Sequence, residues 1–577
     1  MNSRLSQATY PLGLALFALI LAIYKAIKLT IDMGADTSVT LSIVGLDAFF
    51  LSILFLLAML QAFFRLSWLR IISSLVLLLL TLFYLVDCFV LFALDEHANL
   101  FEIGRYTPEW RVVESFFDFK AYLAIFLLLI SFWLTPVATT FIRMTGMLLL
   151  VATVLAATFS AGRAPQPLKH YAMLSPHYLL DSITKAGEVT GYSHAEMEFY
   201  AGLKREAADI PVSRPDVILL VIESLSSINS EKTSEALGLL DGFDRLAEEG
   251  VLFTNFFANH QASEGGLIAL LGGFPPMHFP TASPYMFDEF AIQDSVVDEY
   301  RKQGYHAEFL TNADLKFIGL DRFLGGLGLD QSRGRDDVEA MRLAPTVVQD
   351  APSDAYLYRE AMSSVKRLQS QEIPFLLTIA TTSTHLPYTH PEGGPDTPEA
   401  VWEWSLHQLV SFYQQLSATG FFENGILLIT GDHRQMRPLT RTETERYGAS
   451  ARARVPLLAI GSRYLEGTID NRFFQQSDLL RKLEKIEKAG VSLSPHPIWV
   501  ERYNRKYGRI DLINKLSVFS ETDQGRLEYR MLVPGNRIEW LDETPPFARQ
   551  LEIQIHSQRS LHQQTRSLLE LPSVENH

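Results

Sequence analysis

The sequence predicts a five-helix transmembrane domain, then an α/β domain with a largely parallel central sheet, then a small antiparallel addition at the C-terminal end. Two observations carry this prediction. Before residue 95 only nine side chains are charged, and long apolar runs separate them. After residue 213, short runs rich in Val, Ile and Leu alternate with helical stretches, which is typical of a parallel sheet covered by helices.

A membrane-spanning helix needs about 20 mainly apolar residues. Five segments meet this requirement, and they are residues 10–31, 39–64, 70–94, 120–142 and 144–161. Basic residues gather at the N-terminus and in the links after the second and fourth segments, as Arg4, Arg65, Arg70 and Arg143. The positive-inside rule places these parts in the cytoplasm. With five spans, everything after about residue 162 is then expected outside the cytoplasm.

Apart from the first residues of two spans, four charged residues lie within the predicted spans, where isolated charges are energetically costly. They are Lys25, Lys28, Asp47 and Asp87. One interpretation is a structural ion pair that joins helices, and the other is a polar notch that receives a lipid head group. Because charged groups inside membranes usually pair with one another, the first interpretation is favoured.

The patterns divide the chain into four parts. We expect a transmembrane domain over residues 1–161, a linker with juxtamembrane helices over 162–213, a catalytic α/β domain over 214–500, and a C-terminal β addition with a loose tail over 501–577. Near-continuous apolar runs predict strands at residues 217–222, 307–310, 375–379, 426–429 and 455–460. Such runs are typical of strands that are buried on both faces.

Side chains that can bind a metal ion follow two of these strands. Glu223 ends the first predicted strand, and Asp432 and His433 follow the fourth. Because ligands of parallel sheets gather beyond the carboxyl ends of the strands, we expect these three groups to meet. Two carboxylates and an imidazole suit Mn²⁺, Mg²⁺ or Zn²⁺ without distinguishing them. Taken singly, each residue also fits an ordinary turn or helix start.

Ser263 stands where an amphipathic helix is expected to begin, and it allows two interpretations. Serine often caps helices through its side-chain oxygen, and from the residue alone this interpretation is favoured. The other interpretation is a nucleophile whose hydroxyl is activated by a metal ion. We expect Gly265 and Gly266 to let a substrate approach the backbone closely.

Charge and cysteine content exclude several classes of protein. The formal net charge of -15 argues against a nucleic-acid-binding protein, which needs a dense basic surface. The single cysteine, Cys88, excludes an intrachain disulfide framework, a multi-cysteine zinc site and an iron–sulfur cluster.

Four motifs occur in a distinctive order. They are VILLVIES at residues 217–224, HQAS at 260–263, TSTHLP at 382–387 and GDH at 431–433. In this order they resemble the lipoteichoic acid synthase-like branch of the sulfatase/alkaline phosphatase superfamily, whose members transfer phosphoglycerol or phosphoethanolamine. Membrane helices followed by an extracytoplasmic domain are also similar to that branch.

The resemblance implies one divalent metal ion, with Mn²⁺ ahead of Zn²⁺ or Mg²⁺. Its implied ligands are Glu223, Ser263, Asp432 and His433. Ser263 matches the nucleophile of the family, which forms a covalent phospho-enzyme, and His385 matches a histidine that contacts the substrate phosphate. The implied location is the bacterial cytoplasmic (inner) membrane, with the catalytic domain in the periplasm.

Two features depart from the family pattern. The usual nucleophile of this branch is Thr rather than Ser. Residues 311–322 lack the Trp of a phosphoglycerol pocket and do not carry Arg at the position expected for it, so the donor head group stays open. Asp314, Arg322 and Arg434 are candidate substrate-binding residues, although each also fits an ordinary surface charge. A formylglycine-type sulfatase is not expected, because Ser263 is followed by Glu-Gly-Gly rather than by x-Pro-x-Arg.

The expected function is therefore a membrane-anchored phosphotransferase. Its expected partners are a membrane phospholipid as donor, a glycan or polymer as acceptor, and the lipid bilayer, with no nucleic acid. Two alternatives stay open. One is a hydrolase of the same fold, a phosphodiesterase or phosphatase, and the other is a non-catalytic membrane protein that senses lipids.

Overall fold

The computed structural model describes residues 10–32, 67–94 and 208–556, together with single positions in 47–57 and the segment 125–128. Within 208–556 the main gaps are 234–240, 278–285, 291–294 and 501–512. The chain divides into two compact units, one of residues 1–186 and 436–444, the other of residues 187–435 and 445–577. Each unit has a hydrophobic core of its own.

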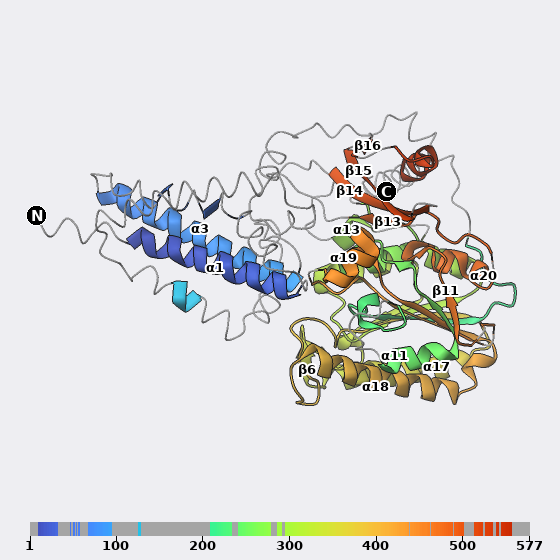
Figure 1. Ribbon diagram of the computed structural model, residues 1–577. Coiled ribbons are helices and arrows are strands. Elements are labelled where there is room, and N and C mark those ends of the chain that lie inside the picture. Colours follow the sequence, from blue (N-terminus) through green and yellow to red (C-terminus); the bar gives the residue numbers. More distant parts are fainter. Residues whose placement is uncertain are drawn as a thin grey trace, which may run out of the picture. The chain divides into compact units, whose positions relative to one another are not determined.

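Two long helices dominate the first unit, α1 (Tyr10–Asp32) and α3 (Ser67–Leu94). They lie side by side in Figure 1, and the core around them contains Ala18, Ala22 and Leu77. In the part of the chain that the structure describes, one helical segment, Ile71–Cys88, is long and apolar enough to cross a membrane.

The described residues cover the predicted spans unevenly. The first and third predicted spans coincide with α1 and α3. The segments 39–64 and 120–142 are described at only a few positions, and the segment 144–161 lies outside the described residues. The predicted linker over 162–213 also lies outside them except for its last six residues.

A buried ion pair links α1 to a residue that lies between the two helices in the sequence. Lys25 Nζ on α1 donates to Asp47 Oδ2 over 2.7 Å, and the Tyr84 hydroxyl on α3 donates to the same oxygen over 2.5 Å. All three side chains are fully buried. The predicted ion pair is confirmed for Lys25 and Asp47, and Tyr84 is a third member that the charge pattern did not indicate.

An eight-stranded sheet forms the centre of the second unit, in the order β11-β2-β10-β9-β1-β8-β4-β5. In chain order the strands are β1 (Asp216–Ile222), β2 (Val251–Phe253), β4 (His306–Thr311), β5 (Gln331–Arg333), β8 (Phe375–Ala380), β9 (Gly425–Gly431), β10 (Leu457–Ile460) and β11 (Thr468–Asp470). Only β10 runs against its neighbours, β9 and β2. The predicted largely parallel sheet is confirmed, and all five predicted strands are present.

Helices cover both faces of this sheet. Along β1, Val217 and Leu219 belong to one core, and Ile218 and Leu220 belong to the other. Helices α11 (Asp241–Leu246), α17 (Asp354–Gln369) and α18 (Pro398–Ser417) lie together over the second core in Figure 1. The first core includes residues of α12 (Ser263–Leu267), α14 (Val296–Lys302), α15 (Leu320–Gly326) and α20 (Leu483–Ile486).

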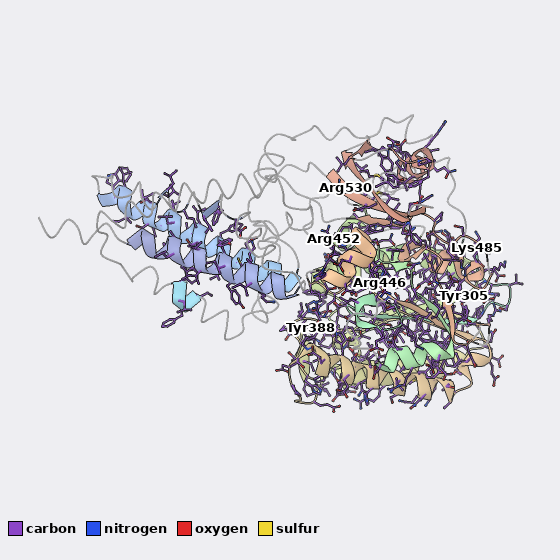
Figure 2. All side chains as sticks on the ribbon, in the orientation of Figure 1. Tyr305, Tyr388, Arg446, Arg452, Lys485 and Arg530 are labelled. Carbon is purple, nitrogen blue, oxygen red and sulfur yellow. The ribbon has the colours of Figure 1, made fainter. Side chains whose placement is uncertain are left out.

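The register of the two central strands brings their carboxyl ends together. β1 and β9 are parallel, with Ile222 opposite Gly431, so the residues that follow both strands emerge at the same edge. The loop after β8 emerges there too, because Val221 of β1 is opposite Ala380. Tyr388 of that loop and Tyr305, which precedes β4, are well separated in Figure 2.

Smaller elements complete the second unit. Strands β13 (Ile498–Val500), β14 (Ile513–Thr522), β15 (Gly525–Pro534) and β16 (Glu539–Trp540) form an antiparallel sheet, which confirms the predicted C-terminal addition. Two short pairs are β3 (Phe256–Phe257) with β12 (Phe474–Gln475), and β6 (Thr346–Val348) with β7 (Ala351–Pro352). The other short helices of this unit are α13 (Met286–Glu289) and α16 (Glu339–Arg342), and the two units divide α19 (Arg441–Tyr447) after Thr444.

Candidate metal centre and active site

Three buried side chains with metal-ligand chemistry meet at the carboxyl ends of β1 and β9. Glu223, Asp432 and His433 each offer one donor atom, and these atoms all lie within 4.8 Å of one another. His433 Nε2 lies 3.5 Å from Glu223 Oε1 and 3.4 Å from Asp432 Oδ2. The structure therefore brings together the three groups that the strand ends predicted.

Hydrogen bonds fix the orientation of the His433 ring. Its Nδ1 lies 2.8 Å from the carbonyl oxygen of Arg434, which can only accept, so Nδ1 donates. Nε2 then faces the carboxylates as the atom available to a metal ion. In metal-binding histidines, the ring nitrogen that does not bind the metal usually donates a hydrogen bond of this kind.

Ser224 supports both carboxylates. Its hydroxyl donates to Glu223 Oε1 over 2.7 Å, and its backbone N–H donates to Asp432 Oδ1 over 2.8 Å. Its φ of 58° lies in the left-handed region, which is unfavourable for residues other than Gly. Strained residues of this kind persist where the surrounding contacts determine the backbone.

The hydroxyl of Ser263 completes the cluster. Its Oγ lies 3.2 Å from Glu223 Oε2 and 3.2 Å from His433 Nε2. The capping interpretation is wrong, because Ser263 is the first residue of α12 and Ala262, without a side-chain cap, occupies the N-cap position. The hydroxyl instead joins two carboxylates and an imidazole, a donor set that fits one divalent cation.

The two glycines after Ser263 serve packing rather than substrate approach. A Cβ on Gly266 would lie 2.1 Å from the carbonyl oxygen of Asp432, and a Cβ on Gly265 would lie 2.3 Å from the His260 ring. The expectation that they admit a substrate is therefore replaced. Gly266 lets the first turn of α12 pack directly against Asp432, which brings Ser263 to the cluster, and Gly265 makes room for the His260 ring.

Gln476, the first residue of a short 3-10 helix after β12, links two parts of the site. The Nε2 group of Gln476, which is fully buried, donates to the carbonyl oxygens of Gly431 and Asp432 over 2.8 and 2.7 Å. Its Oε1 accepts from the N–H of Asn259 over 3.1 Å. Gln476 thus links the end of β9 to the loop that leads to Ser263.

The protonation of the cluster follows from its crowded charges. Burial would raise the pKa of Glu223, but the hydrogen bond from His433 and the charges of His385 and His433 hold it well below its usual range. Burial and the charge of Glu223 raise the pKa of Asp432 to about 7. Burial would lower the pKa of His433, but the charges of Asp432 and Glu223 raise it to about 9. Near neutral pH and without a cation, bound protons therefore compensate the negative charges of the two carboxylates.

His385 belongs to the loop after β8, close to the cluster. The preceding Thr384 donates its hydroxyl to the carbonyl oxygen of Glu223 over 2.6 Å, and Thr381 Oγ1 accepts from the N–H of Glu223 over 3.1 Å. The charge of His385 contributes to the low pKa of Glu223. The ring itself contacts the Leu386 carbonyl oxygen through Nδ1 and the Gln349 amide through Nε2.

The remaining substrate-binding candidates lie outside the three-residue cluster. Asp314 Oδ2 lies 3.8 Å from Arg335 Nη2, and Asp314 Oδ1 accepts from the N–H of Lys316. Arg434 is buried, and its Nη1 donates to the carbonyl oxygen of Gln435 over 2.9 Å. The third candidate, Arg322, forms an ion pair with Asp288 at 2.5 Å and is half exposed.

Three functional neighbours were missed from the sequence. Ser224 had a visible signal, since it directly follows a predicted ligand. Gln476 and Gln349 had none, because each is a single neutral residue outside the four motifs. Their roles depend on contacts that only the folded chain brings about.

Part of the second unit is similar to known proteins. Residues 215–401 match the family model described as Sulfatase. Phosphoglycerol transferase I of Escherichia coli is 23% identical over 261 residues, which cover 41% of this chain and 33% of that protein. The corresponding protein of Citrobacter koseri is 24% identical over 155 residues, covering 24% of this chain and 20% of that protein. The chain thus matches about a third or less of the length of these relatives.

Two solved structures match larger shares of the chain at lower sequence identity. A protein of the alkaline phosphatase superfamily from Vibrio parahaemolyticus matches 69% of this chain and 96% of its own, at 19% identity and a TM-score of 0.48. The lipoteichoic acid synthase LtaP from Listeria monocytogenes matches 67% of this chain and 100% of its own, at 14% identity and a TM-score of 0.47.

Proposed function

Because the chain carries a Sulfatase-family domain over residues 215–401, we propose that it is a metal-dependent phosphotransferase. It moves a phospholipid head group, phosphoglycerol or phosphoethanolamine, to a glycan or polymer acceptor. The observation that carries this proposal is the Ser263 hydroxyl, 3.2 Å from both Glu223 and His433. A hydroxyl placed among metal-binding groups is the arrangement that an activated nucleophile requires.

Glu223, Ser263, Asp432 and His433 would hold one divalent cation, for which we propose Mn²⁺ ahead of Zn²⁺ or Mg²⁺. The chemistry that such an ion supplies is positive charge beside the Ser263 hydroxyl and the transferred phosphoryl group. The similarity of part of the chain to phosphoglycerol transferase I supports a lipid-derived donor.

The proposed reaction has two steps. Ser263 Oγ loses its proton and forms a bond to the phosphorus of the lipid phosphodiester. The bond to the diacylglycerol oxygen breaks, and that oxygen takes up a proton. A hydroxyl of the acceptor then attacks the phosphoserine, and Ser263 regains its proton. Two in-line displacements give net retention at phosphorus, and His385 offers charge to the phosphoryl oxygens.

We also propose that the domain is anchored by the predicted five-span transmembrane domain, in the bacterial cytoplasmic (inner) membrane with the α/β domain in the periplasm. The α3 segment Ile71–Cys88 supports one of these spans. An anchor keeps enzyme and lipid on one surface, which raises their effective concentration. Asp314 and Arg434 remain candidates for contacts to the head group.

Mass spectrometry of the Ser263 peptide tests the proposal. The full-length protein, loaded with Mn²⁺, is incubated with vesicles that contain phosphatidylglycerol and phosphatidylethanolamine. We expect Ser263 to gain the mass of one head group and diacylglycerol to appear. The Ser263→Ala variant should show neither, while Ser263→Thr keeps a hydroxyl and should retain part of the activity. Full diacylglycerol release by Ser263→Ala would refute the proposal.

Product analysis separates the transferase from a hydrolase. If water is the acceptor, free glycerol phosphate or phosphoethanolamine accumulates at the same rate with and without a glycan. If the enzyme is a transferase, an added glycan acceptor carries the head group. A protein that binds metal yet releases no diacylglycerol would fit the non-catalytic alternative.

A further inference from the structure

A strained hairpin tip lies next to the candidate phosphate-contacting histidine. Strands β6 and β7 pair antiparallel, with Val348 opposite Ala351, so Gln349 and Asp350 form a two-residue turn. Both have positive φ, 49° and 57°. Turns of this kind strongly favour Asn and Gly at these positions, because other side chains are strained in the left-handed region.

A contact from Arg335 holds the hairpin tip in place. Arg335 Nη1 donates to the carbonyl oxygen of Asp350 over 2.7 Å. The same guanidinium lies 3.8 Å from Asp314 through Nη2. The backbone of the tip is therefore anchored by a contact that does not involve the Gln349 side chain.

The Gln349 side chain reaches the ring of His385. The amide Nε2 of Gln349 lies 2.9 Å from His385 Nε2. On the other side of the ring, Nδ1 contacts the carbonyl oxygen of Leu386. Because a carbonyl oxygen only accepts, Nδ1 carries a hydrogen atom, and Nε2 of the neutral ring accepts from the Gln349 amide. Both ring nitrogens are thus engaged, and the ring is fixed in one orientation.

We propose that Gln349 is a positioning residue for His385. Its amide and the carbonyl oxygen of Leu386 hold the imidazole in one orientation in the loop after β8, where the phosphoryl group of the donor would meet it. This inference rests on the proposed function, since it assigns His385 to the phosphoryl group. It explains why a strained glutamine stands where a glycine would form the turn more easily.

Two matched variants distinguish the effect of the Gln349 side chain from the effect of the backbone strain in the turn. Gln349→Gly removes the amide and relieves the left-handed strain, so the hairpin is retained. Asp350→Gly relieves the same kind of strain one residue later, keeps the carbonyl oxygen that Arg335 contacts, and leaves Gln349 unchanged. Both full-length variants should melt at or above the temperature of the wild type.

The first measurement tests the contact between Gln349 and His385, and it does not depend on catalysis. Diethyl pyrocarbonate reacts with unprotonated imidazole nitrogen, and peptide mass spectrometry gives the rate at each histidine. We expect Gln349→Gly to raise the rate at His385 about fivefold, the factor that one neutral hydrogen bond represents. His407, which is exposed on α18, is the internal reference. An unchanged rate at His385 in Gln349→Gly, or an equal rise in Asp350→Gly, would overturn the proposal.

The second measurement tests how the loss of the Gln349 contact changes the turnover of phosphatidylglycerol in vesicles. If Gln349 positions a group that acts in the transition state, Gln349→Gly lowers kcat about tenfold while KM changes less than about twofold. Asp350→Gly retains the wild-type kcat. A rise in His385 reactivity with unchanged kcat would show that the contact has no positioning role, which also overturns the proposal.

The two measurements keep this inference distinguishable from the proposed function. If the wild type neither releases diacylglycerol nor modifies Ser263, the proposed function fails, and the positioning role for phosphoryl transfer fails with it. If the wild type is active and only the Gln349 comparison fails, the proposed function stands and the positioning role is refuted.

Discussion

The two units of the chain bury charge in different ways. In the first unit, Lys25 pairs with Asp47, and the Tyr84 hydroxyl donates to the same carboxylate oxygen. In the second unit, Glu223 and Asp432 share a single imidazole, that of His433. The hydrogen-bonded contact in the first group pairs one positive with one negative charge, and Asp87 is a further buried carboxylate on α3. The second has two carboxylates for one base, so it needs protons or a cation to balance them.

This difference teaches that the balance of charge, rather than burial itself, separates a structural ion pair from a candidate binding site. A buried pair that satisfies itself has nothing left to bind. A buried cluster with an excess of carboxylates is tolerated only with a compensating charge. The following predictions test this comparison, from the largest expected effect to the smallest.

Removing one carboxylate from the cluster should abolish metal binding and leave the fold intact. We expect Asp432→Asn to weaken Mn²⁺ binding by at least about 100-fold. Substitution of a residue that only contacts a metal ligand usually weakens metal binding by less than this. The melting temperature of the metal-free protein should stay the same or rise, because the repulsion from Glu223 is relieved. Bound metal, measured after dialysis of the full-length protein, checks this. Asp321→Asn, an exposed carboxylate, is the control. Stoichiometric metal in Asp432→Asn would contradict the assignment.

Removing one partner of the ion pair in the first unit should have the opposite consequence. Lys25→Met leaves Asp47 buried without its counter-charge, and we expect a loss of about 3–5 kcal/mol in the free energy of unfolding. The double variant Lys25→Met/Asp47→Leu removes both charges and should regain most of that loss. Detergent-solubilised protein and a denaturant titration provide the measurement. Equal losses of unfolding free energy in the single and double variants would show that the charges of Lys25 and Asp47 do not compensate each other.

Metal binding to the cluster should strengthen as pH rises. Because the pKa of His433 is raised to about 9 and that of Asp432 to about 7, a cation must displace protons from both. We expect the apparent Kd for Mn²⁺ to fall about tenfold per pH unit between 7 and 9, and more steeply below 7. Titrations followed by Mn²⁺ paramagnetic resonance test this. A Kd independent of pH would mean that the cluster is already deprotonated.

The smallest effect concerns a carboxylate that the active site does not use. Burial raises the pKa of Asp216, at the start of β1, to about 6, and the N–H of Phe375 only partly offsets this. A raised pKa in the folded state means that ionisation above about pH 6 destabilises the fold. Asp216→Asn should therefore stabilise the protein by about 1 kcal/mol near pH 7.5, since solvent screens this half-buried group, and by nothing near pH 4. Thermal denaturation at both pH values provides the check.

The sequence indicated the centre of the sheet and the metal cluster because both depend on local patterns. Long apolar runs predicted β1, β8 and β9, and the polar residue after each run marked the site edge. Strands β2, β5 and β11 have three residues each, too few to show a period. The reversal of β10 is set by its neighbours rather than by its own residues.

Other features of the site depended on contacts between distant segments. Ser263 was interpreted as a possible cap, because serine is common at helix starts, and its bond to Glu223 required the folded structure. The glycines after Ser263 were assigned to the substrate, whereas Gly266 makes room for the Asp432 carbonyl. The contacts of Gln476 and Gln349 are made by their side-chain amides, and they leave no mark on composition or spacing.

The pairing of β1 with β9 also bears on the order of assembly. Glu223 and Asp432 are neighbours only because these strands align, although more than 200 residues separate them along the chain. A partly folded chain offers one carboxylate at a time and captures a cation weakly. If the cluster binds a cation as proposed, strong binding would come only after β1 and β9 have aligned.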